Sequence, residues 1–343
     1  MGTRVDRFAK RRLLHMPPHR LLGVARLLAQ TRPLRPVPGW HHAVADELIP
    51  SDERMRAGWR YQKSGPLPSR RIEYRYEIWS EFRRRRLQLP LRMPWYGPLA
   101  VYSYLGNDLS RNVFVGGCYE PNELSFLQHS LRNGMTFVDL GANEGLFSLL
   151  AAHLVGDEGK VVAVEPSRRE LARLRANLML NRFDNVDVIP AAACEDAGSV
   201  ELHIAGYEHE GLNSLGALPS ENLWSSVERV NAIRLSAAID DRAITHVDFI
   251  KIDVEGAEVR ALTGALELLE RDKPVLLLEV NRPLLASQGT SAEDLEQLLG
   301  SLGYVICPFS PQTGLPEEGS LPMVESANVV AVHPSSRPPE VFS

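Results

Sequence analysis

From residue 136 onward, short apolar runs alternate with longer amphipathic stretches. The first run, residues 137–140, is too short for a helix and too aliphatic for a surface loop, so it predicts a buried parallel strand. The turn GANEG separates it from LFSLLAAHL, whose apolar residues predict a well-buried helix. A second apolar run, residues 161–164, completes a strand, helix and strand unit.

The same alternation continues to the end of the chain. Further strands are predicted at 186–193, 247–254, 274–280, 304–307 and 327–332, with additional β pieces at 199–204 and 232–235. Helices are predicted at 123–131, 167–181, 257–270 and 292–302, and Ser167 is placed to cap the second of them. Alternation of β and α at this spacing predicts an α/β fold with a doubly wound, mostly parallel sheet.

Charge divides the chain into two distinct parts. Residues 1–100 hold 21 Lys and Arg against 8 Asp and Glu, whereas the remainder holds 17 against 35. We therefore expect a basic, aromatic, mostly helical region at 1–98, an α/β domain at 99–335 that begins with a small strand pair (VYSYL and NVFVGG), and a tail at 336–343. The arginine run 83–86 leaves three roles open for the basic region: binding nucleic acid, binding a membrane or lipid-linked substrate, or a structural or substrate-capping role, which we favour.

Overall composition is that of an ordinary soluble protein, with 44% hydrophobic residues and a net charge of -5. Cys118, Cys194 and Cys307 are far apart and form no metal-binding or disulfide pattern, so we expect free thiols in a reducing compartment and a cytoplasmic protein. No apolar run is long enough to span a bilayer.

The glycine turn and the acid after the second strand predict a nucleoside site. In such a unit, ligands bind beyond the carboxyl ends of the strands, and an acid that closes the second strand accepts the hydroxyls of a ribose. Glu165 lies 24 residues after Gly141, which suits this role. Three residues separate Gly141 from Gly145, so the turn is not the dinucleotide fingerprint, and Asp139 and Glu144 would repel a pyrophosphate. S-adenosylmethionine fits such a site, and the alternative is an ordinary glycine turn with Glu165 as a solvated strand end.

A second informative stretch is the charged strand around Lys251. Alternate residues of a strand share a face, so Lys251 and Asp253 project together at its carboxyl end. One interpretation is an ion pair that braces the sheet, because a buried charge needs a partner. In the other, Lys251, Asp253 and Glu255 are catalytic: Asp253 or Glu255 takes a proton from an acceptor hydroxyl, and Lys251 stabilises the developing charge or holds the carboxylate.

The end of the next strand raises the question of a metal. Glu279 and Asn281 share one face and are expected near Asp253. A carboxylate, carboxylate and carboxamide set could hold Mg²⁺, although no spacing rule singles it out.

With these residues in view, the chain resembles the FkbM-type family of S-adenosylmethionine-dependent methyltransferases. The resemblance rests on FVDLGANEG, AVEPS, RANLMLN, AAACEDAG and DFIKIDVEGAEVRALTGA. It implies the class I methyltransferase, Rossmann-like fold, with seven strands of which the last is antiparallel, and O-methylation of a sugar or a polyketide-type small molecule as acceptor. It also implies a set of cofactor contacts: Asp139, Gly141, Asn143, Gly145 and Glu165, with Ala192 and Ala193 near the adenine. Cys194-Glu195 departs mildly from the family pattern.

Two other functions remain open at this level. A nicotinamide-dependent oxidoreductase would need a third glycine in the turn, which is missing. A catalytically inactive protein of the same fold would keep the site without turnover and use its basic first 100 residues to bind nucleic acid.

Overall fold

The structure, a computed structural model, describes residues 13, 16–29, 69–116, 119–216, 224–311 and 313–336. Two compact units divide these residues. The first comprises the described residues up to Glu120 together with Tyr207–Gly211, and the second comprises Pro121–Gly206 and those from Leu212 onward. None of the described helices is long and apolar enough to cross a bilayer.

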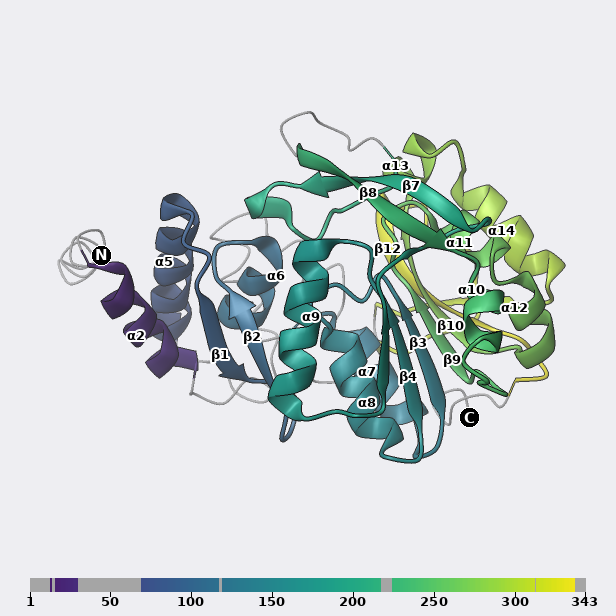
Figure 1. The fold of residues 1–343 in the computed structure, drawn as a ribbon, viewed down its shortest axis with the longest axis horizontal. Helices are drawn as coiled ribbons and strands as arrows, with labels where there is room; N and C mark the ends of the chain where they lie inside the picture. The colour runs from purple at the N-terminus through teal and green to yellow at the C-terminus, as the bar shows by residue number, and fades with distance from the viewer. Residues whose placement is uncertain are drawn as a thin grey trace. The chain divides into compact units, whose positions relative to one another are not determined.

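A seven-stranded sheet forms the centre of the second unit (Figure 1). Its strand order is β11-β12-β10-β9-β3-β4-β5. β12 is antiparallel to both its neighbours, while the other strands run parallel to one another. The bounds are β3 (Thr136–Leu140), β4 (Lys160–Val164), β5 (Val186–Ile189), β9 (Phe249–Ile252), β10 (Val275–Asn281), β11 (Val305–Pro308) and β12 (Ser326–Val332). The class I methyltransferase fold, with its last strand antiparallel, is thereby confirmed.

Helices cover both faces of this sheet, which explains why its central strands are continuous apolar runs. On one side lie α7 (Pro121–Ser130), α8 (Leu146–Val155) and α9 (Arg168–Asn181), and on the other lie α10 (Leu235–Asp240), α11 (Glu258–Thr263), α12 (Leu266–Asp272) and α14 (Ala292–Ser301) (Figure 1). The main core cluster includes Val138, Val162, Ile250 and Leu276 from four strands and Leu295 from α14.

The remaining β pieces form a three-stranded sheet in the order β6-β8-β7. Its strands are β6 (Ala192–Ala193), β7 (Gly198–Ala205) and β8 (Trp224–Ile233). The strand expected at 186–193 is divided, because Pro190 separates β5 from β6. A proline cannot donate to a ladder, so the break there has a simple cause.

One predicted helix, residues 257–270, was wrong as a continuous element. The chain forms α11 and α12 instead, with Gly264 between them. A Cβ atom at Gly264 would lie 1.9 Å from the carbonyl oxygen of Cys194, so the close approach of the two backbones requires glycine. The short helix α13 (Arg282–Ser287), which follows β10, was not predicted.

The first unit is built from helices and one strand pair. It contains α2 (Pro18–Ala29), α5 (Ser69–Arg85), β1 (Pro90–Pro94), β2 (Ala100–Tyr104), α6 (Asp108–Ser110), a π-helical segment (Arg111–Gly116) and the 3₁₀ turn η3 (Tyr207–His209). VYSYL is a strand as predicted, but its antiparallel partner is β1, and the expected strand NVFVGG was wrong because residues 111–116 are helical. The expected boundary between residues 98 and 99 thus separates two strands that pair with each other, whereas the compact units divide at Pro121.

The arginine run of α5 makes contacts inside the first unit. Arg83 pairs with Glu208, while Arg84 and Arg85 both pair with Glu81. Arg85 also donates to the carbonyl oxygens of Met16 (2.6 Å) and Leu13 (3.0 Å). These contacts agree with a structural role for this run.

Candidate functional site

The glycine turn after β3 has the backbone geometry that its sequence predicts. Gly141 (φ 77°), Asn143 (φ 49°) and Gly145 (φ 88°) all adopt positive φ. A Cβ atom at Gly141 would lie 1.8 Å from the carbonyl oxygen of Asp253, because the chain that follows β9 passes directly against this turn. Two of the sequence-predicted regions, the glycine turn and the end of the charged strand, therefore meet at the carboxyl edge of the sheet.

Glu165, which follows β4, points at the glycine turn. Its Oε2 atom accepts a hydrogen bond from the backbone N–H of Asn143 and its Oε1 atom accepts one from Ser167, both at 2.8 Å. Burial raises the pKa of Glu165 to about 8, and the nearby Glu170 adds to this effect, while the two backbone donors oppose it. A carboxylate has about four lone-pair sites, so this one retains acceptor capacity on each oxygen.

Asp139 lies inside the protein and is inaccessible to solvent. Its Oδ2 atom accepts from the Ser148 hydroxyl at 2.5 Å, while Oδ1 has no hydrogen-bond partner among the described residues. Burial raises the pKa of Asp139, and the charge of Lys251, which is its register partner on β9, opposes this. The expected contact between Asp139 and the cofactor stays a prediction.

Glu144, expected to repel a pyrophosphate, is neutralised by an ion pair. Its Oε1 atom lies 2.8 Å from Nη1 of Arg173, and both side chains are almost fully buried. The Asn177 amide donates to the Glu144 carbonyl at 2.8 Å. This charge therefore holds α9 against the turn, and the repulsion argument rests on Asp139 alone.

Lys251 and Asp253 form the predicted ion pair. The Lys251 Nζ atom lies 2.7 Å from Asp253 Oδ2, with side-chain exposures of 6% and 15%. The Lys251 ammonium also lies 4.6 Å from the centre of the Phe147 ring. The bracing role is therefore present, and the Asp253 carboxylate stays partly accessible to solvent.

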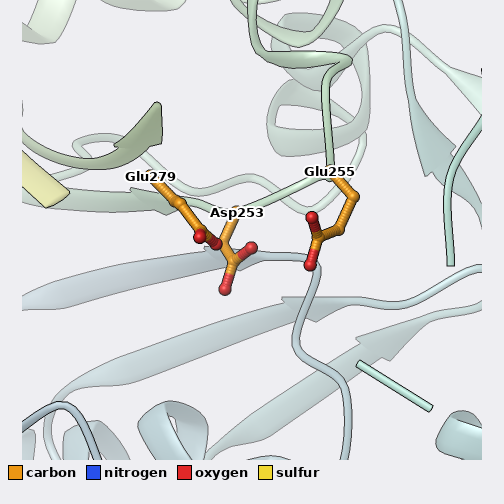
Figure 2. A group of neighbouring side chains, drawn as sticks. All are labelled: Asp253, Glu255 and Glu279. Carbon is orange, nitrogen blue, oxygen red and sulfur yellow. The ribbon is translucent and has the colours of Figure 1, made fainter. Parts of the chain in front are cut away.

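Three carboxylates gather beside this pair. Oxygen atoms of Asp253, Glu255 and Glu279 all lie within 4.8 Å of one another, and Figure 2 shows them converging from two strand ends and a turn. Asn281, expected in this group, instead caps α13 by accepting from the Leu284 N–H. Acidic side chains often gather without a metal, and no further observation in the described residues points to one, so we assign no Mg²⁺ here.

The turn that carries Glu255 is held from three sides. Glu255 has a left-handed backbone (φ 50°), and its carbonyl oxygen accepts from the Ser214 hydroxyl at 2.6 Å and the Gln288 amide at 3.2 Å. Glu258 accepts from the Gly256 N–H at 3.1 Å, and burial raises the pKa of Glu258 to about 7. Sequence reasoning missed Ser214, Gln288 and Glu258. Of these three, only Glu258 could have been found from the sequence, because it lies two residues after the turn glycine.

Ala192 and Ala193, expected near the adenine, are both buried and pack in two different hydrophobic clusters. The acid that follows them, Glu195, pairs with Arg260 of α11 at 2.8 Å. Their contact with an adenine stays a prediction.

Comparison with known proteins agrees with this geometry. Residues 139–306 match the methyltransferase FkbM domain. The 31-O-demethyl-FK506 methyltransferase FkbM of Streptomyces tacrolimicus is 31% identical over 188 residues, which cover 46% of this chain and 67% of that protein. The chain belongs to the FkbM methyltransferase family.

Two further proteins were found to be similar to this FkbM family member. Methyltransferase sdnD of Sordaria araneosa is 25% identical over 203 residues, covering 51% of this chain and 74% of that one. The solved structure of methyltransferase FkbM from Methylobacillus flagellatus is 18% identical and covers 66% of this chain and 55% of its own, with a TM-score of 0.38. The residues matched by the family model lie in the second unit and in the Tyr207–Gly211 segment of the first, outside α2 and α5.

Proposed function

We propose that this FkbM family member is an S-adenosylmethionine-dependent methyltransferase that methylates a hydroxyl group of a small molecule. The observation that carries the proposal is the position of Glu165. Its carboxylate is buried, turned toward the glycine turn by the Asn143 N–H, and able to accept two further hydrogen bonds. A ribose with both hydroxyls free supplies those two donors.

The residues present fit this cofactor better than a dinucleotide. The turn offers positive-φ backbone at Gly141 and Gly145 for a close approach, and the buried Asp139 beside it disfavours the pyrophosphate of a dinucleotide. The cofactor, when bound, supplies an activated methyl group on a sulfonium. The protein has to hold it and to align an acceptor.

Proton transfer is the step for which the carboxylates are suited. A hydroxyl that receives a methyl group loses its proton, and Asp253 or Glu255 accepts it as general base. Lys251, at 2.7 Å, holds the Asp253 carboxylate in one orientation. The name of the Streptomyces tacrolimicus relative describes methylation at an oxygen, which supports O-methylation of a sugar or polyketide-type acceptor here.

The proposal is tested by calorimetric titration of the full chain with S-adenosylhomocysteine, in parallel with NAD. We expect saturable binding of the first and none of the second. Absence of S-adenosylhomocysteine binding at millimolar concentration, or tighter binding of NAD, would refute the assignment.

A further inference from the structure

Two exposed apolar side chains lie next to each other just before β12. Met323 is 86% exposed and Val324 is 52% exposed, and together they are called the apolar pair below. The other exposed large apolar side chains of the described residues stand singly on four separate elements: Leu27, Tyr74, Met179 and Val227. Single exposed apolar residues are ordinary on a protein surface, so the adjacent pair is the feature that needs an explanation.

The apolar pair lies at the carboxyl edge of the main sheet. β12 is antiparallel to β10, so it begins where β10 ends, and Ser326 is the register partner of Asn281. Three residues of chain span at most about 11 Å, which keeps Met323 within that distance of Ser326. The ends of β3 and β9 lie at the same edge, because these strands run parallel to β10.

A hydrogen bond connects this segment to the acidic side chains of the site. The Ser326 hydroxyl donates to Glu279 Oε1 at 3.1 Å. Glu279 in turn lies beside Asp253, as Figure 2 shows. A short length of chain therefore separates the apolar pair from the carboxylates that we propose as the general base.

Arg282 holds this segment in place. Its backbone N–H donates to the Glu325 carbonyl at 2.9 Å, and its guanidinium donates to the Pro322 carbonyl at 3.3 Å and pairs with Glu293 at 2.9 Å. The residues on both sides of the apolar pair are thus fixed. A ligand that covers these two side chains gains hydrophobic free energy, and the fixed segment has little conformational freedom left to lose on binding.

We propose that Met323 and Val324 contact a hydrocarbon portion of the methyl acceptor, whose reacting hydroxyl lies at the neighbouring carboxylates. A polyketide-type acceptor has such a portion, and a bare sugar has none. The acceptor role rests on the proposed function. The contact with a hydrocarbon rests on the exposure, the position and the fixed backbone of the apolar pair.

Methyl glucoside and octyl glucoside test the proposal, because they share a head with hydroxyl groups and differ in their hydrocarbon chain. Binding to the full chain, with and without S-adenosylhomocysteine, is measured by NMR on protein whose methionine methyl groups carry ¹³C, with octyl glucoside below its micelle-forming concentration. We expect octyl glucoside to bind at least about tenfold more tightly, the gain from burying about two of the added methylene groups. It should also shift the Met323 methyl signal.

Polar residues of similar size at both positions, Met323→Gln with Val324→Thr, should reduce the difference between the two glucosides to about threefold or less. The same double variant identifies the Met323 methyl signal by its loss. Met179→Gln is the matched control, because Met179 is 79% exposed on α9 of the same unit. It should leave the difference between the glucosides unchanged.

Equal binding of the two glucosides, no binding of either, an unmoved Met323 signal, or an equal loss in Met179→Gln would overturn the proposal. A Met323 signal that moves only when phosphatidylcholine vesicles are added would assign the apolar pair to a lipid surface instead. Competition between octyl glucoside and S-adenosylhomocysteine would contradict the acceptor role, because an acceptor binds beside the cofactor. If S-adenosylhomocysteine itself fails to bind while octyl glucoside binds as expected, the methyltransferase proposal and the acceptor role fail, and the hydrocarbon contact remains.

Discussion

Replacing Glu165 by glutamine should change how cofactor binding depends on pH. In the ligand-free protein burial raises the pKa of Glu165 to about 8, so the carboxyl is mostly protonated at neutral pH. Ribose hydroxyls donate to the ionised form, which means that binding selects the carboxylate and releases a proton below about pH 8.

The magnitude follows from the size of this shift. With this pKa the ionised fraction is about one hundredth at about pH 6 and about one half at about pH 8, so the affinity for S-adenosylhomocysteine should rise by up to about 50-fold between them, equivalent to about 2.3 kcal/mol. Glu165→Gln removes this dependence. It should also weaken binding at about pH 8 by about 10-fold to 100-fold, because the amide cannot accept at both positions.

Calorimetry in two buffers with different ionisation enthalpies measures the affinity and the proton count together. Subtracting the pH profile of Glu165→Gln removes the titration of the ligand itself. A profile that is equally flat in both proteins, with no proton released by the wild type, would refute the ribose assignment.

The same group should affect the stability of the ligand-free protein. In the folded state the pKa of Glu165 is raised, so between its ordinary value and about 8 the folded protein holds a proton that the unfolded chain has lost. Stability should therefore fall as the pH rises through this window. The stability of the Glu165→Gln variant, measured by urea denaturation, should fall less over the same pH range. An equal or steeper fall in the variant would count against the buried position of this carboxyl.

Three further substitutions test other parts of the site. Gly141→Ala should destabilise the protein more than Gly134→Ala by at least about 2 kcal/mol in urea denaturation: both glycines have positive φ, but a Cβ at Gly141 meets the Asp253 carbonyl at 1.8 Å and one at Gly134 meets nothing within 4 Å. An equal loss of stability in the two variants would contradict the close approach of the Gly141 backbone to the Asp253 carbonyl. Asp253→Asn should lower turnover by about 100-fold or more with nearly unchanged S-adenosylhomocysteine affinity, and a fully active variant would leave Asp253 only a bracing role. Arg173→Met should cost about 3–5 kcal/mol of unfolding free energy because it leaves Glu144 charged and buried, and a loss below about 1 kcal/mol would contradict that pairing.

Local patterns predicted most of the second unit. The apolar runs at 137–140 and 161–164 could be recognised as β3 and β4 because strands that are covered on both faces consist mainly of apolar residues. The glycine turn and Glu165 were visible because their spacing follows from a strand, helix and strand unit of ordinary length. Errors arose where a distant backbone intervened, as at Gly264, where the carbonyl of Cys194 leaves no space for a side chain.

The acidic group at the sheet edge shows where sequence reasoning ends. Period-two alternation placed Glu279 and Asn281 on one face, but the side chain of Asn281 instead caps the N-terminus of α13. Glu255 joined the group instead, because a left-handed residue turns its side chain in a direction that no strand pattern predicts.

The order of apolar and polar residues, a short-range property, was enough to specify most elements of the second unit, the glycine turn and the acid that follows β4. Which charges become partners was decided by the folded chain. Arg83 of the basic helix pairs with Glu208, and Gln288 meets the carbonyl of Glu255, across long stretches of sequence. Side-chain bonds of this kind depend on distances of a few ångströms between remote segments, and only the packed protein sets those distances.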